Sequence, residues 1–127
     1  MIIEIDIQSD IPIYTQLVYE IKRGIYLGVL HQGDSLPSVR SLAGDIGINL
    51  HTVNKAYKTL VSEGVVEQVK KGYVISAKVP SEISPNYQKK LEKQIERLVI
   101  DTAIFGMDLS ELVQEATRRI EGDVSHD

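Results

Sequence analysis

The side chains best suited to chemistry lie in one stretch near the middle of the chain, where short polar groups precede lysines. The amide of Asn54 can pair with the edge of adenine through two hydrogen bonds, and Lys55 can reach guanine acceptors or a phosphate. His51, Thr52 and Lys58 belong to the same stretch. The pattern is typical of a helix that enters the major groove of DNA. The alternative is that these residues form only the solvated face of an ordinary helix.

The distribution of charge favours a polyanionic partner, although the chain as a whole is acidic. The 127 residues carry a formal net charge of -4. Residues 36–79 contain six basic and three acidic side chains, a net charge of +3, whereas residues 1–35 and 80–127 carry -3 and -4. For a polyanion this asymmetry matters more than the total. The basic middle segment contains the polar stretch described above.

Other kinds of chemistry find little support. The chain has no cysteine, which excludes disulfides, thiolate zinc sites and cysteine nucleophiles and suits the cytoplasm. His31, His51 and His126 share no ligand spacing, and there is neither a phosphate-cradling glycine loop nor a Ser, His and Asp arrangement. No apolar run approaches the roughly 20 residues of a membrane span, and the first residues lack the basic region and apolar core expected of a signal peptide. We therefore expect a cytoplasmic protein with no metal, no cofactor and no membrane contact, and not an enzyme.

Two short helices must position the polar stretch. Asn49 can cap a helix that ends before Gly64, with an apolar stripe formed by Val53, Ala56, Tyr57, Leu60 and Val61. Ser38 can cap the preceding helix, whose inward residues are Val39, Leu42, Ala43 and Ile46, and Gly47 separates the two. Helices joined by such a tight turn form a helix-turn-helix. A longer helix precedes them, beginning near Pro12 and ending near Gly28, with apolar positions Tyr14, Leu17, Val18, Ile21 and Ile25.

The remaining N-terminal segments have β character. Residues 65–69 and 73–76 are β-rich runs on either side of Lys70, Lys71 and Gly72, which predicts a hairpin with a basic tip. The alternation of Ile3, Ile5 and Ile7 with polar residues indicates either a short half-buried strand or an extended arm. Together these elements predict an α+β fold, a winged helix-turn-helix domain over residues 1–77.

A linker over residues 78–84 and a helical tail over residues 85–127 are expected to follow. Ser84 can cap, and Pro85 can start, a long helix whose apolar residues recur at spacings of 4, 3, 4 and 3: Leu91, Ile95, Leu98, Thr102 and Phe105. A last helix begins near Asp108 and carries Leu112 and Val113 on its apolar face. A two-helix hairpin is too small to bury both faces, so the wing domain or a second copy must cover it. The near-heptad seam favours a homodimer.

Four strings in the first 76 residues resemble the N-terminal domain of GntR-family transcription regulators: IYTQL at 13–17, GVL at 28–30, GDSLPSVRSLA at 33–43 and TVNKAY at 52–57. The resemblance covers about residues 9–76. The chain lacks the longer effector-binding or aminotransferase-like domains of most of that family, and its two-helix tail resembles the YtrA subfamily. That resemblance implies a small dimeric repressor, often of bacterial transporter operons, whose C-terminal helices form the dimer.

The resemblance also implies roles for residues outside the polar stretch. Arg40 occupies the position at which the family places an arginine at the DNA, and its forked donors suit phosphate or guanine. The alternative for Arg40 is a surface ion pair with Asp45. We expect Ser38 to cap a helix end that also faces a phosphate, and Asn49 to act mainly as a cap. Tyr57 either packs in the core or contacts a phosphate through its hydroxyl.

The hairpin tip departs from the family pattern, which has Gly-x-Gly followed by two apolar residues. Here Lys70 and Lys71 precede the single Gly72, and we expect these lysines to contact the DNA backbone. Whether the shortened tip also contacts the minor groove is left open by the sequence. The tail has no volume for an evident ligand cavity except at an interface, and the sequence indicates no effector. The expected partner is double-stranded DNA with an inverted repeat, because the dimer is two-fold symmetric. Two rivals remain: a winged helix that binds protein, and a small enzyme subunit.

Overall fold

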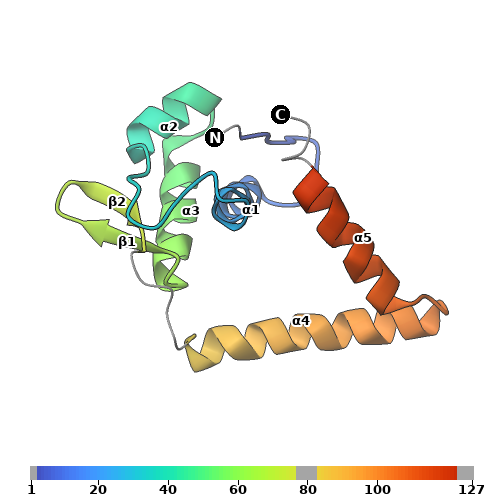
Figure 1. The fold of residues 1–127 in the computed structure, drawn as a ribbon. Helices are drawn as coiled ribbons and strands as arrows, with labels where there is room; N and C mark the ends of the chain where they lie inside the picture. The colour runs from blue at the N-terminus through green and yellow to red at the C-terminus, as the bar shows by residue number, and fades with distance from the viewer. Residues whose placement is uncertain (1–2, 77–82, 123–127) are drawn as a thin grey trace. The chain divides into compact units, whose positions relative to one another are not determined.

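A computed structural model describes residues 3–76 and 83–122 (Figure 1). The elements follow in the order α1 (Ile13–Tyr26), α2 (Val39–Ile46), α3 (Leu50–Ser62), β1 (Val66–Val69), β2 (Gly72–Ile75), α4 (Pro85–Ile104) and α5 (Leu109–Gly122). The chain divides into two compact units, Met1–Glu82 and Ile83–Asp127. The predicted α+β class, with a winged helix-turn-helix followed by two helices, is confirmed.

One hydrophobic core holds the three helices and the hairpin of the N-terminal unit together. Most of the predicted apolar stripes supply it, and α3 contributes four side chains that are fully inaccessible to solvent. Burial of this kind contributes about 1.5 to 3 kcal/mol for a large aliphatic or aromatic side chain, so the core fixes which face of each helix points inward. The fully inaccessible side chains of α1 and α3 are Leu17, Ile21, Val53, Ala56, Tyr57 and Leu60.

The turn between α2 and α3 is held by the local bonds that the sequence predicts. The Ser38 hydroxyl accepts a hydrogen bond from the Ser41 amide at 3.0 Å, and the Asn49 side chain accepts one from the His51 amide at 2.7 Å. Gly47 ends α2 with φ +69°, a left-handed backbone conformation that residues with a Cβ atom rarely adopt. Both predicted caps are therefore confirmed.

The predicted hairpin is present and acquires an additional neighbour. β1 pairs with β2 in antiparallel register from Val66 opposite Ile75 to Val69 opposite Gly72, which leaves two lysines as the turn. On the other side of β2, the Ile75 amide donates to the Asp34 carbonyl and the Leu36 amide to the Tyr73 carbonyl, each at 2.8 Å. The segment before α2 thus covers the exposed edge of β2, a long-range pairing that the sequence did not predict.

The opening segment is an extended arm rather than a strand. Residues 3–6 have no ladder partner; instead, the Gln16 side chain accepts from the Asp6 amide at 2.8 Å and donates to the carbonyls of Asp6 and Ile11 at 3.0 and 2.8 Å. Ile3 and Ile5 pack against the core. The expectation that Ile7 continues this buried face is wrong, because a turn begins there and leaves the side chain 75% exposed.

The C-terminal unit is a pair of helices. The Ser84 hydroxyl accepts from the Tyr87 amide at 3.2 Å, and Asp108 accepts from the Ser110 amide at 2.9 Å, so the predicted starts of both helices are confirmed. Gly106, with φ +66°, makes the turn between them. Residues 78–82 of the expected linker lie outside the described residues, and so do residues 123–127 of the expected helical tail.

None of the helices described for this chain combines the length and apolar character of a membrane span.

Replacing Tyr57 with phenylalanine tests how much the hydrogen bond of its hydroxyl contributes to stability. The Tyr57 hydroxyl donates to the Pro37 carbonyl at 2.8 Å, so we expect Tyr57→Phe to lower the free energy of unfolding by about 1 kcal/mol at pH 7. Burial, and secondarily the charge of Tyr73, raises the pKa of Tyr57 from 10.0 to about 12. Between pH 10 and about 12 the unfolded wild type binds fewer protons than the folded wild type, so its free energy of unfolding falls as the pH rises. Because Tyr57→Phe lacks this hydroxyl, the difference in free energy of unfolding between the wild type and the variant narrows over the same range. Urea unfolding at pH 7 to 12 measures both effects.

Tyr19→Phe is the matched control, because the side chain of Tyr19 is 54% exposed. A difference between Tyr57→Phe and the wild type that stays constant above pH 10 would contradict the assignment.

Candidate nucleic-acid interface

Helix α3 separates its apolar and polar side chains onto different faces. The apolar stripe is buried, whereas the side chains of His51, Lys55 and Lys58 are exposed and those of Thr52 and Asn54 are half-buried. Because the caps at Ser38 and Asn49 satisfy backbone amides, and the core holds the inner face, this outer face has a defined orientation. The structure thus brings the predicted polar stretch together on one accessible surface, which we call the α3 outer face.

Arg40 lies in the first turn of α2 and is exposed. Across residues 3–76 and 83–122 it forms no ion pair, so the alternative of a bridge to Asp45 is not present there. The guanidinium keeps all its donors available for an anion.

Lys70 and Lys71 are exposed at the hairpin turn, and Gly72, at which β2 begins, is half-buried. A two-residue turn keeps the two ammonium groups at the end of the hairpin. Their position agrees with the expected contact with a nucleic-acid backbone, which remains a prediction.

Tyr57 belongs to the core and not to the candidate interface. Its side chain is 0% exposed, and its ring forms a T-shaped pair with the Tyr73 ring at a centroid separation of 5.0 Å. The hydroxyl is already occupied by the Pro37 carbonyl. Of the two roles considered for Tyr57, the structure supports packing.

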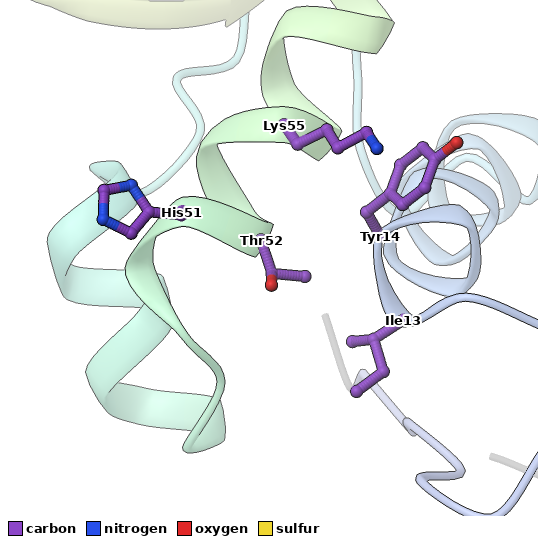
Figure 2. A pocket seen from close by; sticks show the side chains of 5 residues that line it. All are labelled: Ile13, Tyr14, His51, Thr52 and Lys55. Atoms are coloured by element: carbon purple, nitrogen blue, oxygen red, sulfur yellow. The ribbon is translucent and has the colours of Figure 1, made fainter.

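A hollow of about 400 Å³ lies beside the α3 outer face, and sequence reasoning did not identify it. Figure 2 shows its lining, which comes from the first turn of α1 and the first two turns of α3: Ile13, Tyr14, His51, Thr52 and Lys55. The Lys55 ammonium lies over the Tyr14 ring, 4.1 Å from its centroid. The sequence places Tyr14 only on an apolar stripe, because helical periodicity gives no information on contacts between helices.

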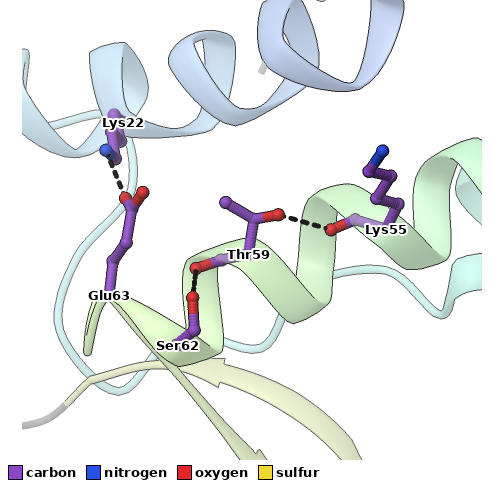
Figure 3. A network of polar contacts seen from close by, with 5 residues as sticks. All are labelled: Lys22, Lys55, Thr59, Ser62 and Glu63. Atoms are coloured by element: carbon purple, nitrogen blue, oxygen red, sulfur yellow. Dashed lines mark hydrogen bonds and ion pairs between the residues drawn. The ribbon is translucent and has the colours of Figure 1, made fainter.

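Polar contacts also tie the far end of α3 to α1, as Figure 3 shows. Lys22 of α1 forms an ion pair with Glu63, the residue that ends α3, and both side chains are largely buried. The Thr59 hydroxyl donates to the Lys55 carbonyl at 2.8 Å, and the Ser62 hydroxyl donates to the Thr59 carbonyl at 2.7 Å. These hydroxyls are used within the helix, so Thr59 has no spare donor for a ligand.

The predicted dimerisation residues differ in exposure. Ile95, Leu98, Phe105 and Val113 are 52 to 76% exposed, and Leu91 and Leu112 are half-buried. Thr102 is buried, and its hydroxyl donates to the Leu98 and Val99 carbonyls at 2.7 and 3.2 Å. Apolar side chains that the seam did not include are exposed as well: Val99, Ile100, Ile104 and Met107.

Comparison with known proteins shows the family to which the chain belongs. The sequence model for bacterial regulatory proteins of the gntR family matches residues 13–74. The chain is 37% identical over 123 residues to the HTH-type transcriptional repressor YtrA of Bacillus subtilis, covering 96% of this chain and 94% of that protein. This chain belongs to the GntR family. It is accordingly a DNA-binding transcription regulator and not an enzyme, which removes the rival of a small enzyme subunit.

Two solved structures extend the comparison of this GntR-family protein. A crystal structure described as a transcriptional antiterminator from Listeria monocytogenes EGD-e is 30% identical and has a TM-score of 0.87, covering 95% of this chain and 93% of that one. The DNA-binding domain of AraR in complex with operator ORX1 is 27% identical, with a TM-score of 0.53 over 60% of this chain and 99% of that one. A domain of similar fold is thus found on operator DNA.

Substitutions at the helix starts separate capping from surface charge. We expect Asn49→Ala to lower the free energy of unfolding by about 1 kcal/mol, because the His51 amide loses its acceptor. Arg40→Ala removes an exposed side chain without a described partner, so we expect it to change the free energy of unfolding by no more than about 0.5 kcal/mol. Urea unfolding of the two variants gives the comparison. If Arg40→Ala lowers the free energy of unfolding as much as Asn49→Ala does, Arg40 has a structural role.

Proposed function

We propose that the protein is a homodimeric repressor that binds an inverted-repeat operator, with α3 of each protomer in one half-site. The observation that carries the proposal is the α3 outer face, where polar and basic side chains are exposed while the opposite face is held in the core. A helix fixed in this way can present its side chains to base edges without distortion of the domain.

Within this proposal the side chains divide into readers and anchors. Asn54 and His51 face base edges, with Asn54 suited to adenine. Thr52 and Lys58 contact either bases or the backbone, and Arg40 contacts phosphate or guanine from the start of α2. Lys70, Lys71 and the backbone at Gly72 contact the DNA backbone. Ser38 and Asn49 act mainly through the helix ends that they cap.

Dimerisation is proposed to occur through the C-terminal unit. Ile95, Leu98 and Phe105 are 58, 52 and 76% exposed on α4, more apolar surface than a small monomer usually leaves to solvent. Ile100 and Ile104 add exposed apolar surface on other sides of the helix. A helix that is apolar on several sides is suited to the interior of a bundle, here one built by two copies.

The resemblance to the YtrA subfamily extends the proposal to a bacterial transporter operon as the target and to action in the cytoplasm. The proposal requires no metal and no cofactor. It leaves the effector unassigned.

Selection of bound sequences from random double-stranded DNA tests the operator. We expect a two-fold symmetric consensus, and an affinity whose logarithm falls with the logarithm of salt concentration at a slope of about -7, for roughly four phosphates per protomer. Arg40→Ala should weaken binding by about tenfold or more. A single-stranded RNA copy of the selected site is the control for an antiterminator-like activity. A slope near zero, or absence of a palindromic consensus, would sink the proposal.

A charge placed on the seam tests the dimer. We expect Leu98→Glu to convert the protein to monomers in sedimentation velocity, because a buried carboxylate without a partner opposes association. Lys89→Gln changes the net charge by the same amount on the opposite side of α4 and should leave the dimer intact. A dimer that survives Leu98→Glu would contradict the assignment of the seam.

A further inference from the structure

Lys55 differs from the other lysine of the α3 outer face in having an aromatic partner. Its ammonium lies 4.1 Å from the centroid of the Tyr14 ring, well inside the range of a cation–π interaction. Lys58 has neither a ring nor a carboxylate as partner among the described residues. In Figure 2 the Lys55 side chain extends from α3 toward Tyr14 on α1. One of two neighbouring lysines is therefore held in place.

Tyr14 is a fixed platform for that ammonium. It is half-buried and packs against the core in the first turn of α1. The same part of α1 is anchored by Leu17, which is fully buried, and by Gln16, which binds the N-terminal arm through three hydrogen bonds. A lysine side chain has many rotamers, so a ring that restricts it before binding reduces the entropy lost on contact with an anion.

The surroundings of the Lys55 ammonium leave its charge available. Ile13, His51 and Thr52 complete the lining of the hollow, and no carboxylate is among the lining residues. A ring attracts a cation through its face without neutralising it, so the N–H groups on the other side of the ammonium can still bind an anion.

We propose that Tyr14 is a positioning residue that holds the Lys55 ammonium beside α1, where it binds a phosphate of the DNA backbone and not a base edge. The proposal rests on the proposed function and deepens it. Base edges are reached by the face of α3 that enters the groove, whereas an ammonium drawn sideways toward α1 lies at the groove's rim, where the phosphates run. Lys55 then contributes affinity and salt dependence without sequence preference.

The test uses the full chain on a selected operator duplex, with Tyr14→Leu, Tyr14→Phe, Lys55→Met and Lys58→Met. We expect Tyr14→Leu to weaken binding about 2- to 5-fold per half-site, whereas Tyr14→Phe keeps the ring and stays near the wild type. Lys55→Met should lower the salt slope by about 1 per protomer without changing the selected consensus.

Double-mutant cycles separate positioning from general damage to the domain. Tyr14→Leu should have little further effect in the Lys55→Met background, and its full effect in the Lys58→Met background. If Tyr14→Leu and Lys55→Met reduce the free energy of DNA binding additively in the double variant, the inference is overturned. A Tyr14→Phe variant as weak as Tyr14→Leu would also overturn it, since the hydroxyl would then be the active group, and so would a changed base preference in Lys55→Met.

A second measurement requires neither DNA nor a stable Tyr14→Leu variant. The ε-methylene protons of Lys55 should show an upfield ring-current shift in the proton NMR spectrum of the wild type and of Tyr14→Phe, and those of Lys58 should not. An unshifted Lys55 signal would overturn the inference. If the wild type binds no duplex, both the proposed function and the inference are wrong. If the wild type binds normally but the effects of Tyr14→Leu and Lys55→Met are additive, only the inference is wrong.

Discussion

Tyr57 joins the three parts of the N-terminal unit that carry the candidate interface. Its ring is buried in the core from α3, its edge-on contact with Tyr73 reaches the hairpin, and its hydroxyl binds the Pro37 carbonyl immediately before α2. A buried hydroxyl needs a partner, and the Pro37 carbonyl supplies it. The relative positions of α2, α3 and the hairpin therefore depend on one side chain that does not itself face a ligand.

Besides the shared core, two cationic contacts of different kinds join α3 to α1. At one end the Lys55 ammonium lies over the Tyr14 ring, and at the other Lys22 forms an ion pair with Glu63. Lys22 and Glu63 are largely buried, so their ion pair is shielded from solvent and serves the fold. Lys55 is exposed, so its charge can be shared with a ligand. Burial thus separates a structural cation from a functional one on the same pair of helices.

Local features of this chain could be predicted from the sequence because they depend on neighbouring residues. The caps at Ser38, Asn49 and Ser84 each involve an amide two or three residues away. The hairpin turn at Lys70 and Lys71 is likewise local. The apolar periodicity of α1 and α3 correctly indicated the core, since a helix can bury only one stripe against its neighbours.

Long-range features could not be predicted in the same way. Neither the pairing of Leu36 with Tyr73 nor the clamp of Gln16 on Asp6 leaves a periodic signal, because each joins segments that are distant along the chain. Ile7 was expected to point inward from alternation alone, and a turn overrode that alternation.

The sequence by itself determined the helices, their caps, the basic middle segment and the family resemblance, all of which depend on residue type and short spacing. Only the tertiary structure decided that Tyr57 is core and that Lys55 meets Tyr14. It also decided that Thr102 is buried although most of the seam residues are exposed. The physical reason is that burial and contacts between helices are properties of the packed chain: two side chains 41 positions apart become neighbours only when the core has set the positions of their helices.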